Sequence, residues 1–110
     1  MEKINFSALL PAMLDAAKAP LHDQWEAAGP YAATEFKNFT ESLAGIALQK
    51  LEGSISEAEA KLLVSMQQES MKTVLLAVKG MSLVAVESAI NAALGVLKDT
   101  VNTAIGFRLL

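Results

Sequence analysis

The chain has 110 residues, of which 53% are hydrophobic, and it carries nine Lys plus Arg against twelve Asp plus Glu. This length is enough for one domain, and the slight acidic excess with singly scattered basic residues excludes a nucleic-acid-binding protein, which would gather Lys and Arg into a basic stripe. The absence of cysteine excludes disulfides and thiolate metal ligands.

The first residues do not fit a secretion signal. Glu2 removes the positive charge expected at the start of such a signal, and Pro11 and Asp15 interrupt the apolar run that should follow. We therefore expect a protein that is not exported by the usual route and that works in the cytoplasm or inside a larger particle.

Residues 1–52 predict an N-terminal arm of helices broken by proline. Apolar side chains first recur at the spacing of one amphipathic helix face, at Phe6, Leu9, Leu10, Met13, Leu14 and Ala17. Pro20 is expected to end or kink this helix, and Gly29 with Pro30 predicts a second boundary. A further helix then runs to about Glu52, with a core face of Phe36, Phe39, Leu43, Ile46, Ala47 and Leu51.

Residues 53–55 predict the clearest turn of the chain. Gly53 can close the preceding helix in the left-handed conformation that glycine adopts easily. Ser56 and Glu59 have the spacing of a capping box, in which each side chain accepts a hydrogen bond from the other residue's backbone amide. The turn lies near the midpoint, so it predicts two helical arms folded against each other.

Residues 56–106 predict a long helical arm, because they contain no proline and end at a glycine suited to a cap, Gly106, followed by Phe107. A narrow polar stripe follows the arm at steps of mainly four and seven residues, at Lys61, Gln68, Lys72, Lys79, Glu87, Asn91, Lys98 and Asn102. If Gly80 breaks the arm, the chain forms a compact four-helix bundle; if not, it forms an elongated hairpin. The stripe passes Gly80 with little change of phase, which favours a continuous helix.

The sequence therefore predicts a single all-α domain over residues 1–110, a helical hairpin or bundle with a long C-terminal helix. Small residues on the second arm form a candidate self-association strip, because they let another helix approach closely: Ala77, Gly80, Ala85, Ala89, Ala92, Ala93 and Gly95. Glu87 and Asn91 interrupt the same apolar stretch and form a candidate polar pair that sets the register between helices or subunits. The other interpretation is that both lie on the solvated stripe.

No residue pattern predicts catalysis. The chain lacks a nucleophile elbow and a glycine-rich phosphate loop, and its one histidine has no partner that would make it a base. His22, Asp23 and Glu26 are the only candidate metal ligands, but no second ligand-bearing helix accompanies them. We therefore expect no enzyme activity, no metal or other cofactor, and no small-molecule ligand.

The apolar excess points to a partner, since a domain of this size leaves part of its apolar surface exposed. The leading hypothesis is a non-catalytic, self-assembling structural, scaffold or adaptor protein, a class that includes virion components, acting as a homo-oligomer or with a protein partner. The alternative is a membrane-associated amphipathic helical protein, although Lys79 and Glu87 disfavour a membrane span. A third hypothesis is a carrier of an apolar ligand within the bundle.

Overall fold

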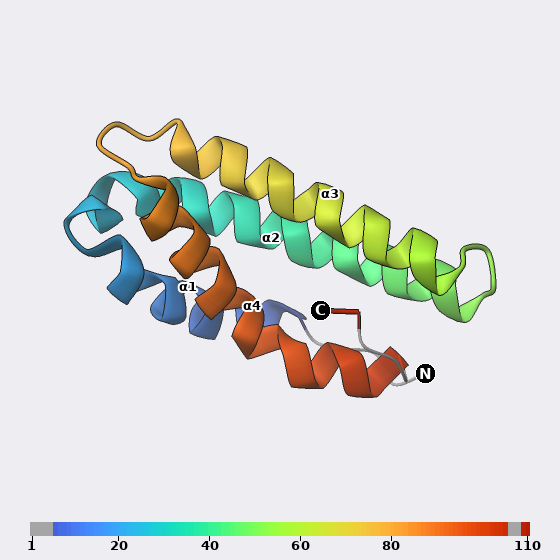
Figure 1. Ribbon diagram of the computed structural model, residues 1–110. Helices are drawn as coiled ribbons and strands as arrows, with labels where there is room; N and C mark the ends of the chain where they lie inside the picture. Colours follow the sequence, from blue (N-terminus) through green and yellow to red (C-terminus); the bar gives the residue numbers. More distant parts are fainter. Residues whose placement is uncertain (1–5, 106–108) are drawn as a thin grey trace.

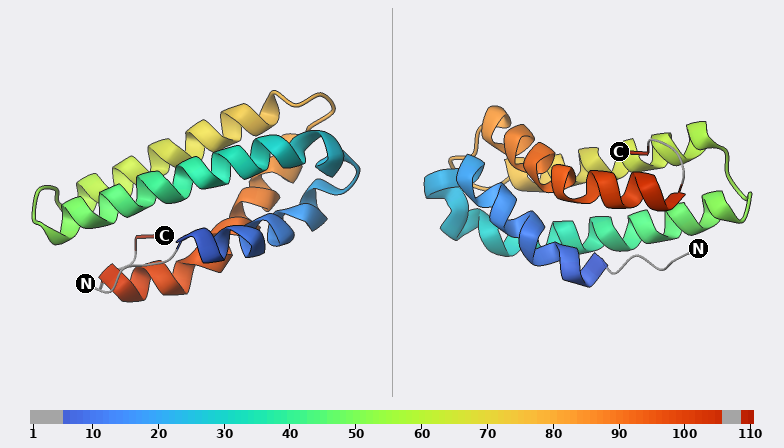
Figure 2. Two further views of the ribbon diagram at one scale, coloured as in Figure 1. Left: turned by 180° about the vertical axis from the view of Figure 1, so that it is seen from behind. Right: turned by 90° about the horizontal axis from the view of Figure 1, so that it is seen from below.

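The computed structural model describes residues 6–105 and 109–110, and over these residues it is all-α, as predicted (Figure 1). Its elements are α1 (Phe6–Leu21), the 3-10 turn η1 (His22–Gln24), α2 (Trp25–Leu51), α3 (Glu57–Leu76) and α4 (Leu83–Ile105). Successive helices run in opposite directions, so the chain forms an up-down-up-down bundle about 43 Å long (Figures 1 and 2).

The four helices do not pack equally closely. The contact between α1 and α4 is the most extensive, and α2 lies against both α1 and α3. The contact between α3 and α4 is the smallest of the four neighbouring pairs, and Figure 1 shows these two helices diverging from their connecting turn. The edge between α3 and α4 is therefore the most open side of the bundle.

The predicted continuity of residues 56–106 is wrong, because the arm breaks between Leu76 and Leu83. α3 ends at Leu76, and Gly80 has φ +82° in the turn that follows, where the Met81 amide donates to the Val78 carbonyl at 3.1 Å. Ser82 then caps α4 by accepting the Ala85 amide at 3.1 Å. The break lets α4 fold back and bury its apolar face against α1. Within the described residues the chain is thus a four-helix bundle, and the predicted cap at Gly106 and Phe107 lies outside them.

The predicted helix boundary at Gly29 and Pro30 is also wrong, because α2 passes through both residues. Pro30 lies near the start of α2, and its missing N–H removes only the bond to the carbonyl of residue 26. Gly29 lies against the indole of Trp25, and a Cβ there would lie 3.4 Å from Trp25 Cε2, an ordinary van der Waals contact. The chain turns earlier, at η1, where His22 has φ +47°.

The turn after α2 is confirmed in detail. Gly53 has φ +79°, and the amides of Gly53 and Ser54 donate to the carbonyls of Lys50 and Gln49, as in a Schellman motif. The capping box is present too, because Ser56 N–H donates to Glu59 Oε1 at 3.0 Å and Glu59 N–H donates to Ser56 Oγ at 3.1 Å. These local bonds join α2 and α3 into the α2–α3 hairpin.

The predicted core faces of the first arm are largely confirmed. Met13, Ala17 and Leu21 are buried on α1, and the α2 face is buried except at its end, where Leu51 is 45% exposed. Leu9, Leu10 and Leu14 pack against the core while half-buried, and the side chain of Phe6 lies outside the described part of the chain. Each helix contributes one buried stripe, which is why a bundle forms.

Candidate functional site

A polar cleft lies along the open edge between α3 and α4. It has a volume of about 280 Å³ and is lined by Gln68, Glu69, Lys72, Glu87, Ile90 and Asn91. Among these residues only Ile90 is apolar, and it is nearly fully buried at the base of the cleft. This lining would not suit an apolar ligand, because the polar groups would lose their water without gaining hydrogen bonds. The apolar ligand considered from the sequence would lie in the bundle interior, so that hypothesis stays a prediction.

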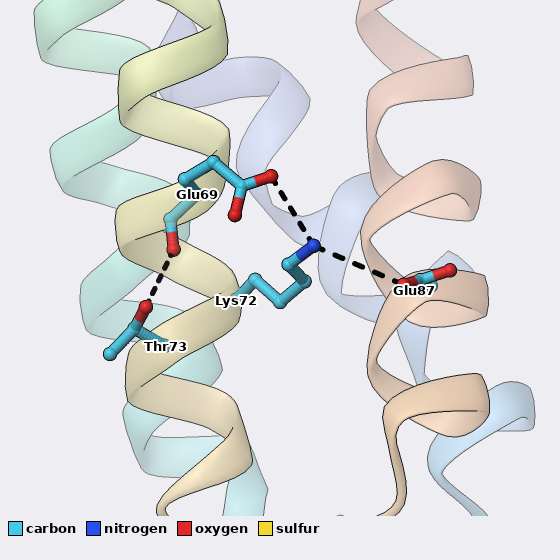
Figure 3. Close-up of polar contacts among 4 residues, drawn as sticks. All are labelled: Glu69, Lys72, Thr73 and Glu87. Atoms are coloured by element: carbon cyan, nitrogen blue, oxygen red, sulfur yellow. Dashed lines mark hydrogen bonds and ion pairs between the residues drawn. The ribbon is translucent and has the colours of Figure 1, made fainter.

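Lys72 lines the cleft, and its side chain reaches from α3 towards Glu87 on α4 (Figure 3). Its Nζ lies 3.2 Å from Glu69 Oε1, one turn away on α3, and 3.9 Å from Glu87 Oε1 on α4. The Glu69 carbonyl also accepts a hydrogen bond from Thr73 Oγ1 at 3.0 Å. Because the side chain of Glu87 is 51% exposed, these ion pairs are each worth at most ~1 kcal/mol.

The cleft is made from the predicted polar stripe. Gln68 and Lys72 come from its first half, and Glu87 and Asn91 come from its second half. On a continuous helix these residues would form one line, but the break at Gly80 folds the line back on itself. The two halves thereby become the facing walls of one cleft.

The candidate register pair, Glu87 and Asn91, is brought together on one wall of this cleft. Both residues are exposed, as the solvated-stripe interpretation expects, and Glu87 also reaches across to Lys72 on the neighbouring helix. Neither residue lies in the core, so a role in setting register between subunits stays a prediction.

The candidate self-association strip does not form one surface. Ala89 and Ala93 are fully buried, Ala85 and Ala92 are half-buried, and Gly95 is exposed. Ala77 and Gly80 lie in the turn before α4, outside either helix. Ala89 and Ala93 therefore pack in the core of their own chain, on the buried face of α4, and a second copy cannot contact them.

The structure brings no additional ligand to the three candidate metal ligands within the described residues. His22, Asp23 and Glu26 are exposed around η1, and among the described residues no group of three His, Cys, Asp or Glu side chains could hold a metal ion. In the same turn, the side chain of Gln24 lies against Gly80.

Sequence reasoning missed Glu69 and Ile90 in the cleft and missed the contact between Lys72 and Glu87. The available signal was the pair of residues Gly80, which has a left-handed φ in the turn after α3, and Ser82, which caps α4. Once a turn is placed there, Lys72 and Glu87 lie at nearly equal distances from it along the chain. Such residues face each other in an antiparallel helix pair.

Exposed apolar side chains lie on both helices near the closed end of the α2–α3 hairpin. We call this group the hairpin patch; it consists of Leu48 and Leu51 from the last two turns of α2, and Leu62 and Met66 from the first half of α3. Their exposed fractions are 50%, 45%, 61% and 58%, respectively. Charged residues of both signs flank the patch, at Lys50, Glu52, Glu57, Glu59 and Lys61.

Comparisons of this chain with protein-family models, with curated proteins and with solved structures find no match. Over the part of the chain that the structure describes, none of the helices has both the length and the apolar character to cross a membrane. The stretch from Thr73 to Leu97, whose only charged residues are Lys79 and Glu87, is divided between α3 and α4.

Proposed function

We propose that this chain is a non-catalytic, self-assembling structural or scaffold protein that binds further copies of itself through the hairpin patch. The observation that supports the proposal is that Leu48, Leu51, Leu62 and Met66, each roughly half exposed or more, all lie near the closed end of one hairpin. Single exposed leucines are ordinary on protein surfaces, but groups of them occur where partners bind.

The composition around the patch also fits an interface between copies. Interfaces of homodimers have an apolar centre with methionine enriched, and a polar rim that stays hydrated. The hairpin patch supplies the apolar centre, and the charged residues around Gly53 supply a rim of mixed sign. Mixed sign allows a two-fold pairing in which acidic and basic side chains of the two copies meet.

The expected affinity is modest. Burying a leucine or methionine completely is worth about 1.5 to 3 kcal/mol, so the half-exposed side chains of the patch would each gain about 1 kcal/mol. Eight such side chains in a dimer would gain about 8 kcal/mol, while association itself costs about 4 to 15 kcal/mol. We therefore expect reversible association that grows with concentration and is strengthened when many copies assemble.

The direct test is sedimentation velocity over a range of concentrations, comparing the wild-type chain with the double variant Leu62→Lys, Met66→Lys. We expect the wild-type sedimentation coefficient to rise with concentration and that of the variant to stay at the monomer value, because two added charges keep the patch hydrated. The matched control is Leu83→Lys, Val84→Lys, which changes two residues that are 49% and 76% exposed at the start of α4, after the turn that follows α3.

The control variant should associate as the wild type does. A wild-type chain that stays monomeric at every concentration would contradict self-assembly. Equal loss of association in both double variants would contradict the assignment to the hairpin patch, since it would show an effect of net charge alone.

A further inference from the structure

The methionines that the structure describes differ sharply in their exposure to water. Met66 on α3 is 58% exposed, whereas Met13 on α1 and Met71 on α3 are at most 2% exposed, and Met81 is partly buried against the core. The chain contains no cysteine, so methionine supplies all of its sulfur. Because oxidation of a sulfur atom follows its exposure, an oxidant in solution reaches Met66 before the other described methionines.

The position of Met66 makes its oxidation matter for the surface and not for the core. Met66 lies in the hairpin patch one helical turn after Leu62, so the two residues share one face of α3. Oxidation to the sulfoxide changes the side chain from apolar to polar and would leave the packed interior as it is. The same change at Met13 or Met71 would disrupt the core, but burial protects both residues.

We propose that Met66 is a site of reversible oxidation by peroxides, and that the sulfoxide formed there keeps the hairpin patch hydrated and so dissociates assembled copies. The dissociation of copies rests on the proposed function, because it requires the hairpin patch to join them. In the reaction, a lone pair on the Met66 sulfur attacks one oxygen of hydrogen peroxide. An S–O bond forms, the O–O bond breaks, and the second oxygen leaves as water with both hydrogens; the sulfur loses two electrons and the peroxide gains them.

Assembly and oxidation oppose each other at this residue. Association through the hairpin patch covers Met66, so peroxide reaches its sulfur in the free chain, and a chain already oxidised has a polar group in the apolar centre of the interface. Two copies of Met66 enter each dimer, so oxidation of both should raise the dissociation constant about tenfold or more. Methionine sulfoxide reductases reverse the change: the oxygen leaves as water while two thiols of the reductant become a disulfide.

The first experiment maps the site of oxidation. The full-length chain at low concentration is treated with limiting hydrogen peroxide, and peptide mass spectrometry follows the extent of oxidation at each methionine. Met66 should react at least about tenfold faster than Met13 and Met71, and faster than Met81. Oxidation of Met13, Met71 or Met81 at the same rate as Met66 would overturn the assignment of the site.

The second experiment measures assembly by sedimentation velocity. The wild-type chain is compared before oxidation, after oxidation, and after repair by methionine sulfoxide reductases for both sulfoxide epimers with dithiothreitol; association should be lost and then restored. The matched control is Met66→Leu, which keeps an apolar side chain of similar volume without a sulfur atom, so peroxide should not change its association. Circular dichroism should show equal helicity in all samples, because Met66 lies outside the core.

Oxidation at Met66 and its effect on assembly can fail separately. If the unoxidised chain associates and the chain oxidised at Met66 associates equally well, control of assembly by Met66 is wrong while self-assembly stands. If peroxide weakens association equally in Met66→Leu, another residue is responsible and the role of Met66 is wrong. If the unoxidised chain stays monomeric, the proposed function and the dissociation of copies are both wrong, and the mapping alone decides whether Met66 is the oxidation site.

Discussion

At the scale of single residues, the two turns that shape the bundle meet at one contact. His22 in the first turn has φ +47°, and Gly80 in the other turn has φ +82°. Gln24, two residues after His22, places its side chain where a Cβ on Gly80 would lie 3.1 Å from Gln24 Oε1. The side chain of Gln24 therefore lies against the turn that contains Gly80.

His22→Gly should stabilise the chain. A non-glycine residue in the left-handed region costs about 1 to 2 kcal/mol, and glycine would remove this cost. Glycine also loses more backbone entropy on folding, which offsets about 0.5 to 1 kcal/mol of the gain. We expect a net gain of about 0.5 kcal/mol in the free energy of unfolding, measured by urea denaturation. Asp23→Gly is the matched control, since Asp23 does not have a positive φ; it should lower stability, and a gain at both positions would contradict the account.

Gly80→Ala and Gly95→Ala should have opposite effects. Gly80 needs its left-handed φ and lies against Gln24, so alanine there should cost about 1 to 2 kcal/mol. Gly95 lies inside α4, where a Cβ would meet nothing within 4 Å, so alanine should gain up to about 1 kcal/mol. Thermal denaturation followed by circular dichroism measures both. If Gly95→Ala reduces self-association instead, the small-residue strip has an intermolecular role at that position.

At the scale of elements, α3 and α4 are separate helices, so a proline at Ala85 should lower the stability of the chain only slightly. Ala85 lies in the first turn of α4, and its amide donates only to the Ser82 side chain. Ala85→Pro should therefore cost about 1 kcal/mol, the worth of one cap, whereas Ala92→Pro in the middle of α4 should cost about 3 kcal/mol or more. Urea denaturation that gives equal losses for the two variants would indicate a continuous helix through Gly80.

The elements that could be predicted from sequence are those fixed by local bonds. The turn at Gly53 and the capping box at Ser56 follow from side chains within a few residues of each other, and the buried faces of α1 and α2 follow from helical spacing. The break near Gly80 has only a weak local signal, in Gly80 and Ser82, and this signal does not by itself decide between a break and a continuous helix. Glycine inside an apolar run costs only up to ~1 kcal/mol in a helix, so the gain from packing α4 against α1 decides the outcome.

The cleft shows the same limit for the candidate site. Gln68, Lys72, Glu87 and Asn91 were all recognised as polar residues in an apolar arm, but their arrangement as two facing walls exists only after the arm folds back. Glu69 and Ile90 gave no signal, because Glu69 lies beside the stripe and Ile90 has the spacing of an ordinary core residue. Periodicity therefore identified most of these side chains while leaving the site itself unpredicted.

At the scale of the whole molecule, the chain distributes its apolar residues unevenly. One buried core joins the four helices, the edge between α3 and α4 is polar, and the closed end of the α2–α3 hairpin carries the hairpin patch. This distribution separates the surface that should meet other copies from the side that stays hydrated. Self-assembly through the hairpin patch is the central claim.

Methionine methyl NMR tests that claim most directly, because the chain carries its own controls. Met66 is 58% exposed in the hairpin patch, whereas Met13 and Met71 are at most 2% exposed in the core. Between roughly 10 μM and 1 mM, the range expected for weak association, the Met66 methyl signal should shift or broaden progressively while those of Met13 and Met71 stay fixed. A Met66 signal that does not change over this range would contradict self-assembly through the hairpin patch.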